Sequence, residues 1–506
     1  MQKITKLITF FYPFYFAIFP VLAFYSSNKR ELTLDVNVLP AAISIFVTFL
    51  LLIFFRLIPK TKDSAAIIVT FFLIYFFSYQ HISSLITLPY LYSMIFGLLL
   101  FVVLKIRKKA NVHIILTILG LYLVFYNLVQ IIPYETERVI IKMKDGSAEI
   151  PISQAKKQDN PPDIYYLIFD RYARHDTLSK YYGFENEDFY NFLKTNNFYI
   201  ATESAANYPR THLSLGSSLN LDYLDDLVAK VGKENSDYTP VFDIVQNNKV
   251  ASFLKRQGYY YIYAGDWWEP TRVNRNANLN INRYAGFNEY GRKFLGTTIL
   301  KPLIGEYYKG NNFFGLFQDR IYENTNYKFA KLGTIATLPS PKFVFAHMLI
   351  PHFPYLFDKD CRRVEDERKL PEKEKYLQQL ICANTKIKKL VSSILTQSKN
   401  PPVIIIQSDE GPYKVDEMNL NGEQTDWTKV SKEAIKTHVN ILNVYYLPGY
   451  DYERLYPSIS PVNTFRLIFN HYFGTDLKLL EDRNYFIPNI DRSYSYTDIT
   501  DIIRSK

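Results

Sequence analysis

Hydrophobic residues are distributed unevenly along the chain, and the pattern changes near residue 132. Before that point, long apolar runs are interrupted only by short polar stretches, whereas Asp, Glu, Asn and Lys return afterwards at the frequency of a globular domain. A helix needs about 20 apolar residues to cross the hydrocarbon core of a membrane. Five runs approach that length, at residues 4–25, 39–58, 65–82, 88–106 and 113–132. The pattern predicts an N-terminal bundle of about five transmembrane helices, followed by a soluble domain.

The first run has two interpretations. Lys3 and Lys6 precede it, as basic residues precede the apolar segment of a cleaved signal peptide. The run is long for such a segment, however, and four more apolar runs follow it. We interpret it as a retained transmembrane helix.

The positions of Lys and Arg predict the orientation of the bundle, because short cytoplasmic loops carry an excess of these residues. With the N-terminus inside, the outer loops contain only Lys29 and Arg30. The inner segments contain Lys3, Lys6, Arg56, Lys60, Lys62, Lys105, Arg107, Lys108 and Lys109. Five spans then make this a multi-pass protein of the cell membrane with an extracytoplasmic C-terminal domain. A miscount by one span would reverse the side on which that domain lies.

Beyond the bundle, strand patterns alternate with helical patterns. Residues 163–170 (DIYYLIFD) form an apolar run typical of a strand that is buried on both faces. Further strands are predicted at 259–264, 342–349, 402–408 and 439–447, and helices at 187–196, 240–257, 372–397 and 461–472. This alternation favours a doubly wound, mostly parallel α/β sheet with helices on both faces. We place a transmembrane domain at 1–135, a linker at 136–160, the α/β domain at 161–490 and a C-terminal tail at 491–506.

Composition limits the possible binding partners and raises the question of whether the two cysteines form a disulfide. The formal net charge is +10, but the soluble part has no compact Lys/Arg tract and no nucleic-acid-binding motif, so we expect no nucleic-acid partner. The two cysteines, Cys361 and Cys382, both lie in the C-terminal domain. In an oxidising compartment they can pair, and the alternative is two buried, unpaired thiols. Neither their spacing nor their neighbours indicate a zinc site.

Unusual polar residues stand at the ends of three predicted strands. Asp170 ends the first, Asp409 and Glu410 follow the strand IIIQ, and His347 and His352 lie in FAHMLIPHFPY. One carboxylate at a strand end is usually a helix cap or a turn residue. Sites in doubly wound sheets form beyond the carboxyl ends of the strands. Three acidic groups at two such ends therefore predict an oxygen-rich site for a hard divalent cation.

Several segments, taken in order, resemble a known family. They are DIYYLIFDRYARHDTL, NYPRTHLSLGSSLN, FAHMLIPHFPY, IIIQSDEGP, and ILNVYYLPG followed by SPVNTFRLIFNHYFG. The set resembles the sulfatase-like branch of the alkaline phosphatase superfamily, and it is similar to membrane-anchored enzymes of the lipoteichoic acid synthase and phosphoethanolamine transferase type. Those enzymes also place a metal-dependent domain outside the cell behind about five spans, so the resemblance covers nearly the full length. It implies an alkaline-phosphatase-like fold for the C-terminal domain.

The resemblance also implies a set of metal ligands. It assigns this role to Asp170, Thr211, Asp409 and Glu410, with Thr211 as the nucleophile. The family has His where this chain has Glu410. Because Glu ligates Mg²⁺, Mn²⁺ or Ca²⁺ but suits zinc less well, we expect a divalent metal, with Mn²⁺ or Mg²⁺ favoured over Ca²⁺ and Zn²⁺. The alternative consequence of this replacement is loss of activity.

Physical chemistry gives these residues definite roles. A threonine hydroxyl needs a base or a metal to become a good nucleophile, and a helix that begins at Thr211 would attract an anionic phosphoryl group. Ser214, one helical turn further on, is the rival nucleophile. His347, His352 and Arg210 are expected to bind substrate. The alternatives are a His347 that satisfies a buried strand end, a His352 that rigidifies a loop, and a solvated Arg210.

Three classes of function are compatible with these residues. The first, which we favour, is transfer of a phospho-alcohol head group from a membrane lipid to an envelope glycan, lipid or polymer, through a covalent intermediate on Thr211. The second is hydrolysis of phosphate or sulfate esters, although neither Cys361 nor Cys382 lies in the Cys/Ser-x-Pro-x-Arg setting of a formylglycine sulfatase. The third is a catalytically silent, membrane-anchored binding protein, which the replacement at Glu410 leaves open.

Overall fold

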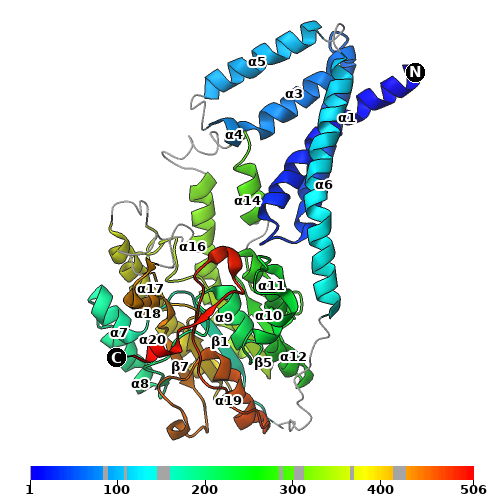
Figure 1. Ribbon diagram of the computed structural model, residues 1–506. Coiled ribbons are helices and arrows are strands. Elements are labelled where there is room, and N and C mark those ends of the chain that lie inside the picture. The colour runs from blue at the N-terminus through cyan, green and yellow to red at the C-terminus, as the bar shows by residue number, and fades with distance from the viewer. Residues whose placement is uncertain are drawn as a thin grey trace. The chain divides into compact units, whose positions relative to one another are not determined.

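The computed structural model describes residues 2–83, 89–106, 111–144, 160–283, 289–300, 313–364, 370–413 and 429–505 (Figure 1). The chain divides into two compact units, Met1–Lys144 with Gly286–Phe317, and Asp145–Ala285 with Gln318–Lys506. The first unit thus takes in a segment from within the range expected of the α/β domain. The basic residues Arg107, Lys108 and Lys109 and most of the predicted linker fall outside the described residues.

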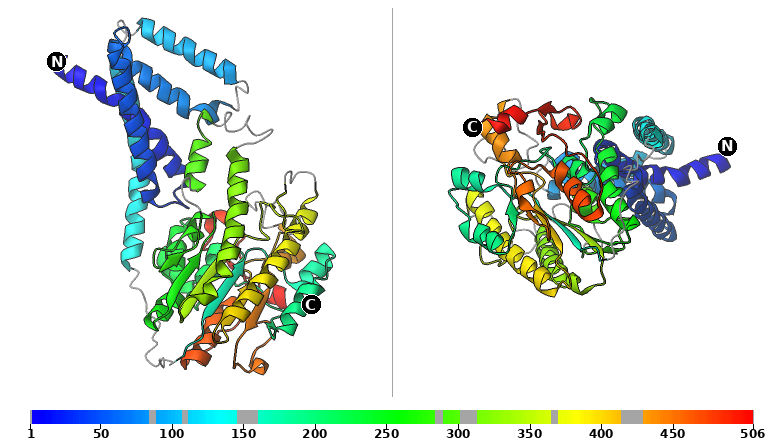
Figure 2. Two further views of the ribbon diagram at one scale, coloured as in Figure 1. Left: turned by 180° about the vertical axis from the view of Figure 1, so that it is seen from behind. Right: turned by 90° about the horizontal axis from the view of Figure 1, so that it is seen from below.

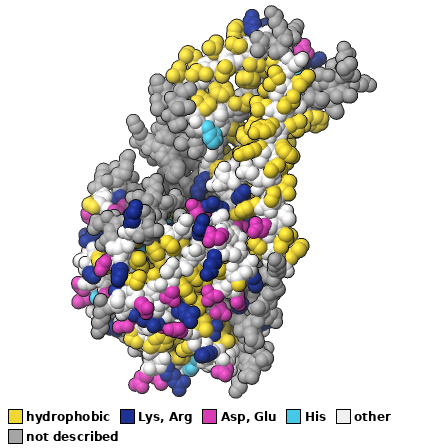
Figure 3. All heavy atoms as spheres, in the orientation of Figure 1, with side chains coloured by type: hydrophobic (Ala, Val, Ile, Leu, Met, Phe, Trp, Pro, Cys, Tyr) yellow, Lys and Arg dark blue, Asp and Glu magenta, His cyan; other side chains and the backbone are white. Residues whose placement is uncertain are grey.

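The first unit consists of helices. They are α1 (Gln2–Asn28), α2 (Val38–Leu57), α3 (Ala65–Phe77), α4 (Tyr79–Ser83), α5 (Pro89–Ile106), α6 (Val112–Lys144) and α14 (Glu289–Leu295). All five apolar runs fall on these helices, but the run 65–82 is divided at Ser78 into α3 and α4. Apolar side chains gather over α3, α5 and α6 on the face shown in Figure 3.

Two of the described helical segments are long and apolar enough to cross a membrane, Leu34–Leu57 and Val112–Met143. Only 11% and 22% of their most apolar windows are buried, which distinguishes them from core helices of a soluble domain. α3 has 13 residues and extends only about 20 Å, less than the roughly 30 Å of a hydrocarbon core. The apolar part of α5, Leu91–Lys105, is also short. The structure therefore does not confirm the count of five spans.

Aromatic side chains pack α14 against the other helices of the first unit. The Tyr290 hydroxyl donates a hydrogen bond to Asn37 Oδ1 at 2.7 Å. Phe24 meets the rings of Tyr290 and Phe294 edge-on, with centroids 5.1 and 5.5 Å apart, and Phe77 contacts Phe294 at 5.8 Å. These contacts explain why a segment from the second half of the chain belongs to this unit.

The second unit is built around a seven-stranded sheet of order β2-β7-β6-β1-β5-β3-β4. The strands are β1 (Ile164–Phe169), β2 (Tyr199–Ile200), β3 (Tyr260–Ala264), β4 (Leu279–Asn280), β5 (Lys342–Met348), β6 (Val403–Gln407) and β7 (Asn443–Tyr446). Strands β6, β1, β5, β3 and β4 run parallel, whereas β7 is antiparallel to β6 and to β2. This mixed, mainly parallel sheet agrees with the predicted fold class.

Helices cover both faces of this sheet (Figure 2). The longer helices of the unit are α8 (Glu187–Thr195), α9 (Thr211–Ser218), α10 (Asp225–Val231), α11 (Thr239–Gln246), α12 (Lys249–Arg256), α17 (Glu372–Gln397), α18 (Lys432–Val439) and α19 (Pro461–Phe473), together with most of α16 (Phe313–Leu332), whose residues up to Phe317 belong to the first unit. Shorter ones are α7 (His175–Thr177), η3 (Leu178–Tyr182), α13 (Glu269–Arg272) and α20 (Thr500–Arg504). On one face, alternate residues of the central strands, such as Tyr166 and Phe345, pack with apolar residues of α9, α12 and α19. The other face is covered by α17 and α8.

Two predicted elements differ from the structure in their bounds. The helix predicted at 240–257 is two helices, α11 and α12, because the Asn248 side chain interrupts it and caps α12 by accepting a hydrogen bond from Ala251 N at 2.8 Å. The strand predicted at 439–447 begins only at Asn443, since α18 continues through Val439. The other predicted strands and helices coincide with β1, β3, β5, β6, α8, α17 and α19 within two residues at either end.

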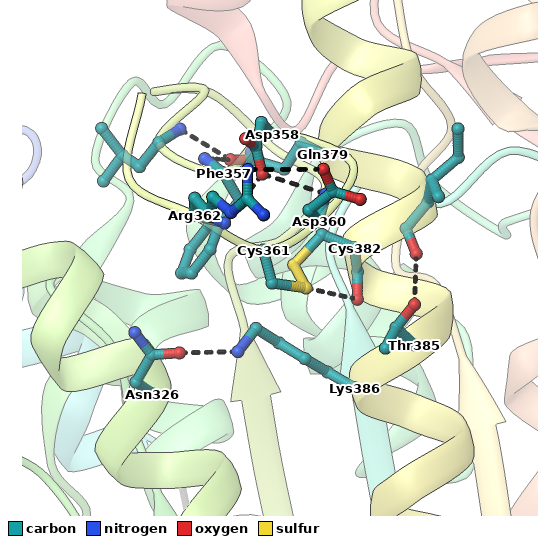
Figure 4. Close-up of a disulfide and its surroundings, with 12 residues drawn as sticks. Asn326, Phe357, Asp358, Asp360, Cys361, Arg362, Gln379, Cys382, Thr385 and Lys386 are labelled. Carbon is teal, nitrogen blue, oxygen red and sulfur yellow. Dashed lines mark hydrogen bonds and ion pairs between the residues drawn. A yellow bond between two sulfur atoms is a disulfide. The ribbon is translucent and has the colours of Figure 1, made fainter. Parts of the chain in front are cut away.

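A disulfide joins Cys361 to Cys382, so the two thiols are not free (Figure 4). Cys382 lies on α17, and Cys361 lies in the loop that follows β5, with 5.0 Å between the Cα atoms. The loop is also held by Asp358, whose Oδ1 accepts hydrogen bonds from the backbone N–H groups of Asp360 and Arg362 at 3.0 and 2.7 Å. Closing a loop of this length stabilises a fold by about 3 kcal/mol in the chain-entropy account.

Candidate functional site

Three neighbouring strands place three of the predicted site residues at one edge of the sheet. Asp170 directly follows β1, Asp409 stands two residues beyond β6, and His347 is the last residue but one of β5. Because β6, β1 and β5 are adjacent and parallel, their carboxyl ends lie side by side. The sheet therefore gathers residues that are up to 239 positions apart, as carboxylates at the ends of parallel strands predict.

Asp170, His347 and Asp409 form a compact buried group. The ligand atoms that they offer all lie within 4.8 Å of one another, and His347 Nε2 is 3.7 Å from Asp170 Oδ2. Asp170 Oδ1, His347 Nε2 and both Asp409 carboxylate oxygens make no hydrogen bond within the described part of the chain. Leaving one buried polar atom unpaired costs about 1–3 kcal/mol. Two carboxylates and an imidazole with open lone pairs are a donor set that fits a divalent cation.

Burial changes the acid–base properties of the group. Loss of solvation raises the pKa of Asp170, and the neighbouring charge of Glu410 raises it further. For Asp409, burial and then the charge of Asp170 raise the pKa in the same way. Burial lowers the pKa of His347. A divalent cation in the group would reverse the carboxyl shifts, because it brings opposite charge into the same poorly solvated space.

Thr211 stands next to this group at the start of α9. It is the first helical residue and is half-buried, and the preceding Arg210 has extended backbone angles. The Thr211 hydroxyl approaches Asp409 closely enough to lower the pKa of that carboxyl, without reaching hydrogen-bond geometry. The first N–H groups of a helix have no partner within the helix and favour an anion. The predicted nucleophile and the two predicted aspartates are thus brought together.

His438 ties the loop before Thr211 to the loop that carries Asp409. Its Nε2 lies 3.1 Å from the carbonyl oxygen of Pro209, and its Nδ1 lies 3.1 Å from that of Gly411. A Cβ atom at Gly411 would come within 2.3 Å of the Thr437 carbonyl oxygen, so only glycine fits there. This packing fixes the distance between the two loops.

Glu410 lies in different surroundings from the group of three. Its Oε1 accepts a hydrogen bond from Arg171 Nε at 3.2 Å, while its Oε2 is buried and has no partner within the described residues. The Arg171 guanidinium lies over the Tyr413 ring at 4.1 Å and near the Phe353 ring at 5.1 Å. The ion pair accounts for a carboxylate at this position, because a histidine here would leave the buried Arg171 without this hydrogen-bonded carboxylate partner.

The other predicted site residues lie around this centre. Arg210 Nη1 is 3.5 Å from the Tyr413 hydroxyl, so one ring contacts both Arg210 and Arg171. His352 is stacked on Phe353 with centroids 4.3 Å apart. Ser214 is buried one turn further along α9, and its backbone N–H donates to the Arg210 carbonyl oxygen at 2.8 Å.

A second layer of residues holds His347 in place. Its Nδ1 is 2.7 Å from the Thr271 hydroxyl, which leaves Nε2 for the carboxylate group. Lys328 Nζ donates to the His347 carbonyl oxygen at 2.9 Å and is paired with Asp266 in a fully buried ion pair. Asp266 Oδ2 also accepts from Leu349 N at 3.1 Å. His347 is therefore fixed at both its ring and its backbone.

We predict that Thr271→Val weakens metal binding by about 10- to 100-fold, as loss of an outer hydrogen bond to a ligating histidine does. Valine keeps the shape of threonine but cannot accept a hydrogen bond from His347 Nδ1–H, so the imidazole is no longer fixed in one tautomer. The measurement is the Mn²⁺ concentration that produces half of the rise in thermal midpoint. Thr271→Ser restores a hydroxyl and should recover most of the affinity; equal losses in both variants would contradict the positioning role.

The sequence alone does not identify Arg171, Thr271 or Lys328 as part of this site. Arg171 directly follows the strand-end aspartate, and that position is a usable signal. Thr271 and Lys328 come from α13 and α16, far from the strand ends in sequence, and only tertiary packing brings them to His347. The sequence also assigns His347 to substrate, whereas the structure places its Nε2 among the carboxylates.

Comparisons with known proteins bear on the same segment of the chain. A sequence model of the sulfatase family matches residues 166–443, more than half of the chain and all of the residues from Asp170 to Asp409. A comparison with curated protein sequences found no match.

Solved structures that match this chain share little sequence with it. The C-terminal periplasmic domain of EcEptC from Escherichia coli, in complex with Zn, is 11% identical with a TM-score of 0.45, covering 69% of this chain and 96% of that one. The integral membrane protein lipooligosaccharide phosphoethanolamine transferase A from Neisseria meningitidis is 11% identical with a TM-score of 0.40, covering 92% and 95%. The assignment rests on the match of the family model: the chain belongs to the sulfatase family.

Proposed function

We propose that this protein is a metal-dependent enzyme that transfers a phospho-alcohol head group from a membrane lipid to an acceptor in the cell envelope. The observation that carries the proposal is the buried group of Asp170, His347 and Asp409, with Thr211 beside it. Like charges and unpaired polar atoms destabilise a fold, so their concentration at one sheet edge favours a functional rather than a structural role.

The proposed ligands are the carboxylates of Asp170 and Asp409, His347 Nε2 and the Thr211 hydroxyl. Glu410 completes the set through its unpaired Oε2 while Oε1 remains on Arg171. When bound, a divalent cation supplies Lewis acidity that lowers the pKa of the hydroxyl and neutralises charge on the nonbridging oxygens. A ligand set dominated by carboxylates favours Mn²⁺ or Mg²⁺, and the imidazole ligand is also compatible with Zn²⁺.

The chain's own residues account for the transfer steps. Thr211 Oγ forms a bond to phosphorus while the bond from phosphorus to the lipid alcohol breaks. A hydroxyl of the acceptor then attacks the same phosphorus, and the bond to Thr211 breaks. Arg210 and the first N–H groups of α9 are positioned to stabilise the nonbridging oxygens. His352, on the loop beside Arg171, is placed to bind the substrate or to donate a proton to the leaving alcohol.

Hydrolysis is the second candidate function, because the family model that matches this chain is that of sulfatases. The test uses the full-length protein in detergent with bis-(p-nitrophenyl) phosphate and p-nitrophenyl sulfate, each with Mn²⁺, Mg²⁺, Ca²⁺ or Zn²⁺ and with EDTA. Turnover of the phosphodiester that requires Mn²⁺ supports the proposal. Turnover of the sulfate ester alone would make the protein a sulfatase. If neither ester is cleaved with any of the four metals, the proposed activity is wrong and a binding role replaces it.

The localisation that we propose is the cell membrane, with the second unit outside the cytoplasm. Two described helices are able to span a membrane, and the basic residues favour a cytoplasmic N-terminus. We predict that alkaline phosphatase fused after Lys506 is active and that green fluorescent protein fused there is dark in a Sec-exporting cell. The opposite pair of results would place the domain in the cytoplasm and would mean an even number of spans.

A further inference from the structure

We infer that Gln379 is a positioning residue for the proposed reaction, because from α17 it holds the loop that carries His352. This role rests on the proposed function, which assigns His352 to the substrate or to the leaving alcohol. Gln379 and Cys382 both lie on α17, near the loop that contains Phe357 and Cys361 (Figure 4). Gln379 is only 1% exposed. A buried amide has to find protein partners for its donor and its acceptor, so the partners of Gln379 indicate its role.

The Gln379 amide bonds to the backbone of one segment, 351–357. Its Nε2 lies within hydrogen-bond distance of three carbonyl oxygens, those of Pro351, His352 and Pro354, at 3.3, 2.7 and 3.3 Å. Its Oε1 accepts from two N–H groups, those of Leu356 and Phe357, at 2.7 and 3.2 Å. Residues 351–356 lie outside the helices and strands, and the two prolines have no N–H to donate. Because the segment lacks a regular backbone ladder, one side chain supplies the partners that its polar groups need.

The segment that Gln379 holds places the His352 ring beside the proposed centre. His352 is partly exposed, and its ring is stacked on Phe353 with centroids 4.3 Å apart. The Phe353 ring lies 5.1 Å from the guanidinium of Arg171, which donates to Glu410. His352 Nδ1 lies against the Phe353 carbonyl oxygen, which leaves Nε2 for a substrate. Since the His352 carbonyl is the partner of Gln379 Nε2 at 2.7 Å, losing this bond releases the residue that carries the imidazole.

Two further residues on the same side of α17 hold neighbouring parts of the site. The Tyr376 hydroxyl, one turn before Gln379, donates to the Arg171 carbonyl oxygen at 2.8 Å. Cys382, one turn after Gln379, is joined by the disulfide to Cys361 further along the loop. Residues three positions apart on a helix are neighbours on its surface. One side of α17 therefore aligns the loops after β1 and β5. Because the disulfide remains when the amide is removed, we expect the loop to loosen without unfolding the unit.

The kinetic experiment is a double-mutant cycle on the full-length protein in detergent, with Mn²⁺ and bis-(p-nitrophenyl) phosphate. Gln379→Met removes the amide and should lower kcat/KM by about 10- to 100-fold, as misplacement of a substrate-binding group does. In the His352→Ala background the same change should cost less than about twofold, because the positioned group is already absent. The rise in thermal midpoint with Mn²⁺ should match that of the wild type. A role confined to stability would instead lower the rate equally in both backgrounds.

Gln378 provides the matched control on the same helix. Its amide donates to Glu374 of α17, at 3.4 Å, so Gln378→Leu should leave the rate unchanged. Gln379→Glu is the second variant, in case the methionine variant does not fold. It keeps an acceptor for the two N–H groups and removes the amide donor, and it should show the same dependence on His352.

Hydrogen exchange tests the contact without turnover. In Gln379→Met the Leu356 and Phe357 amides should exchange at least about tenfold faster than in the wild type and in Gln378→Leu. Unchanged exchange in Gln379→Met, or an equal loss of rate with and without His352, would overturn the inference. A wild-type protein that cleaves neither ester would remove the proposed function and with it the positioning role, even where the exchange result shows that Gln379 holds the loop.

Discussion

Replacing Thr211 by alanine is expected to abolish turnover, by at least about 10⁴-fold in kcat, while the protein remains folded. Removing a covalent nucleophile eliminates the first transfer step and leaves only the residual effect of binding and electrostatics. Thr211 is half-buried and follows the capping position of α9, so its hydroxyl contributes little to stability, within about 1 kcal/mol. The measurement is steady-state turnover of the phosphodiester, together with the thermal midpoint.

Ser214 provides the matched control for this variant. It lies on the same helix one turn deeper, is buried, and has the same type of nucleophilic atom. Ser214→Ala should retain turnover within about threefold, because its hydroxyl is not adjacent to the carboxylate group. Wild-type rates in Thr211→Ala, or a collapse of the rate in Ser214→Ala alone, would mean that Thr211 is not the nucleophile.

Asp409→Asn is expected to have two opposite effects, which a structural carboxylate would not produce. In the metal-free protein it removes a carboxylate whose pKa is raised by burial and by the neighbouring charge of Asp170, so the thermal midpoint should rise by roughly a few degrees. In the presence of Mn²⁺ the rise in midpoint seen for the wild type should disappear, because a ligand is lost. Because the variant binds metal more weakly, its turnover should also be lower than that of the wild type.

Glu410→Gln is the matched control, since it makes the same change one residue along the chain. Glu410 has one oxygen on Arg171 and lies outside the compact group, so its loss should weaken the Mn²⁺ response less than Asp409→Asn does. Glu410→His tests the replacement itself. If Glu410→His turns over substrate faster than the wild type and prefers Zn²⁺, the native glutamate lowers the activity of the site. If Glu410→His is instead less stable than the wild type, the native glutamate is required to pair with Arg171. An equal response to Mn²⁺ in Asp409→Asn and wild type would remove Asp409 from the metal site.

The strands of the sheet, and the polar residues at their carboxyl ends, were predictable because each depends on a local sequence pattern. Residues 163–170 form an apolar run with a terminal carboxylate, and such runs belong to buried parallel strands. Once β1, β5 and β6 are recognised as parallel neighbours, Asp170, His347 and Asp409 must lie near one edge. The strand order follows from contacts across the fold and is not encoded in any one segment.

What the sequence does not reveal depends on side-chain orientation and on packing between distant segments. The direction of the Glu410 side chain is decided by Arg171, which stands on another strand end. The inclusion of α14 in the first unit depends on contacts of Tyr290 with Asn37 and Phe24. The span count is equally difficult to predict, because α3 and α4 divide one apolar run into pieces that hydropathy does not separate.

The most direct test of the account is an experimental structure of the full-length protein grown with Mn²⁺, with diffraction data collected at the manganese absorption edge. We predict one strong anomalous peak in the second unit, within about 2.0–2.4 Å of carboxylate oxygens of Asp170 and Asp409 and of His347 Nε2, with the Thr211 hydroxyl and Glu410 Oε2 completing the set. A protein that shows no peak there, or whose peak is held by residues other than these, would contradict the central claim that this buried group is a metal centre.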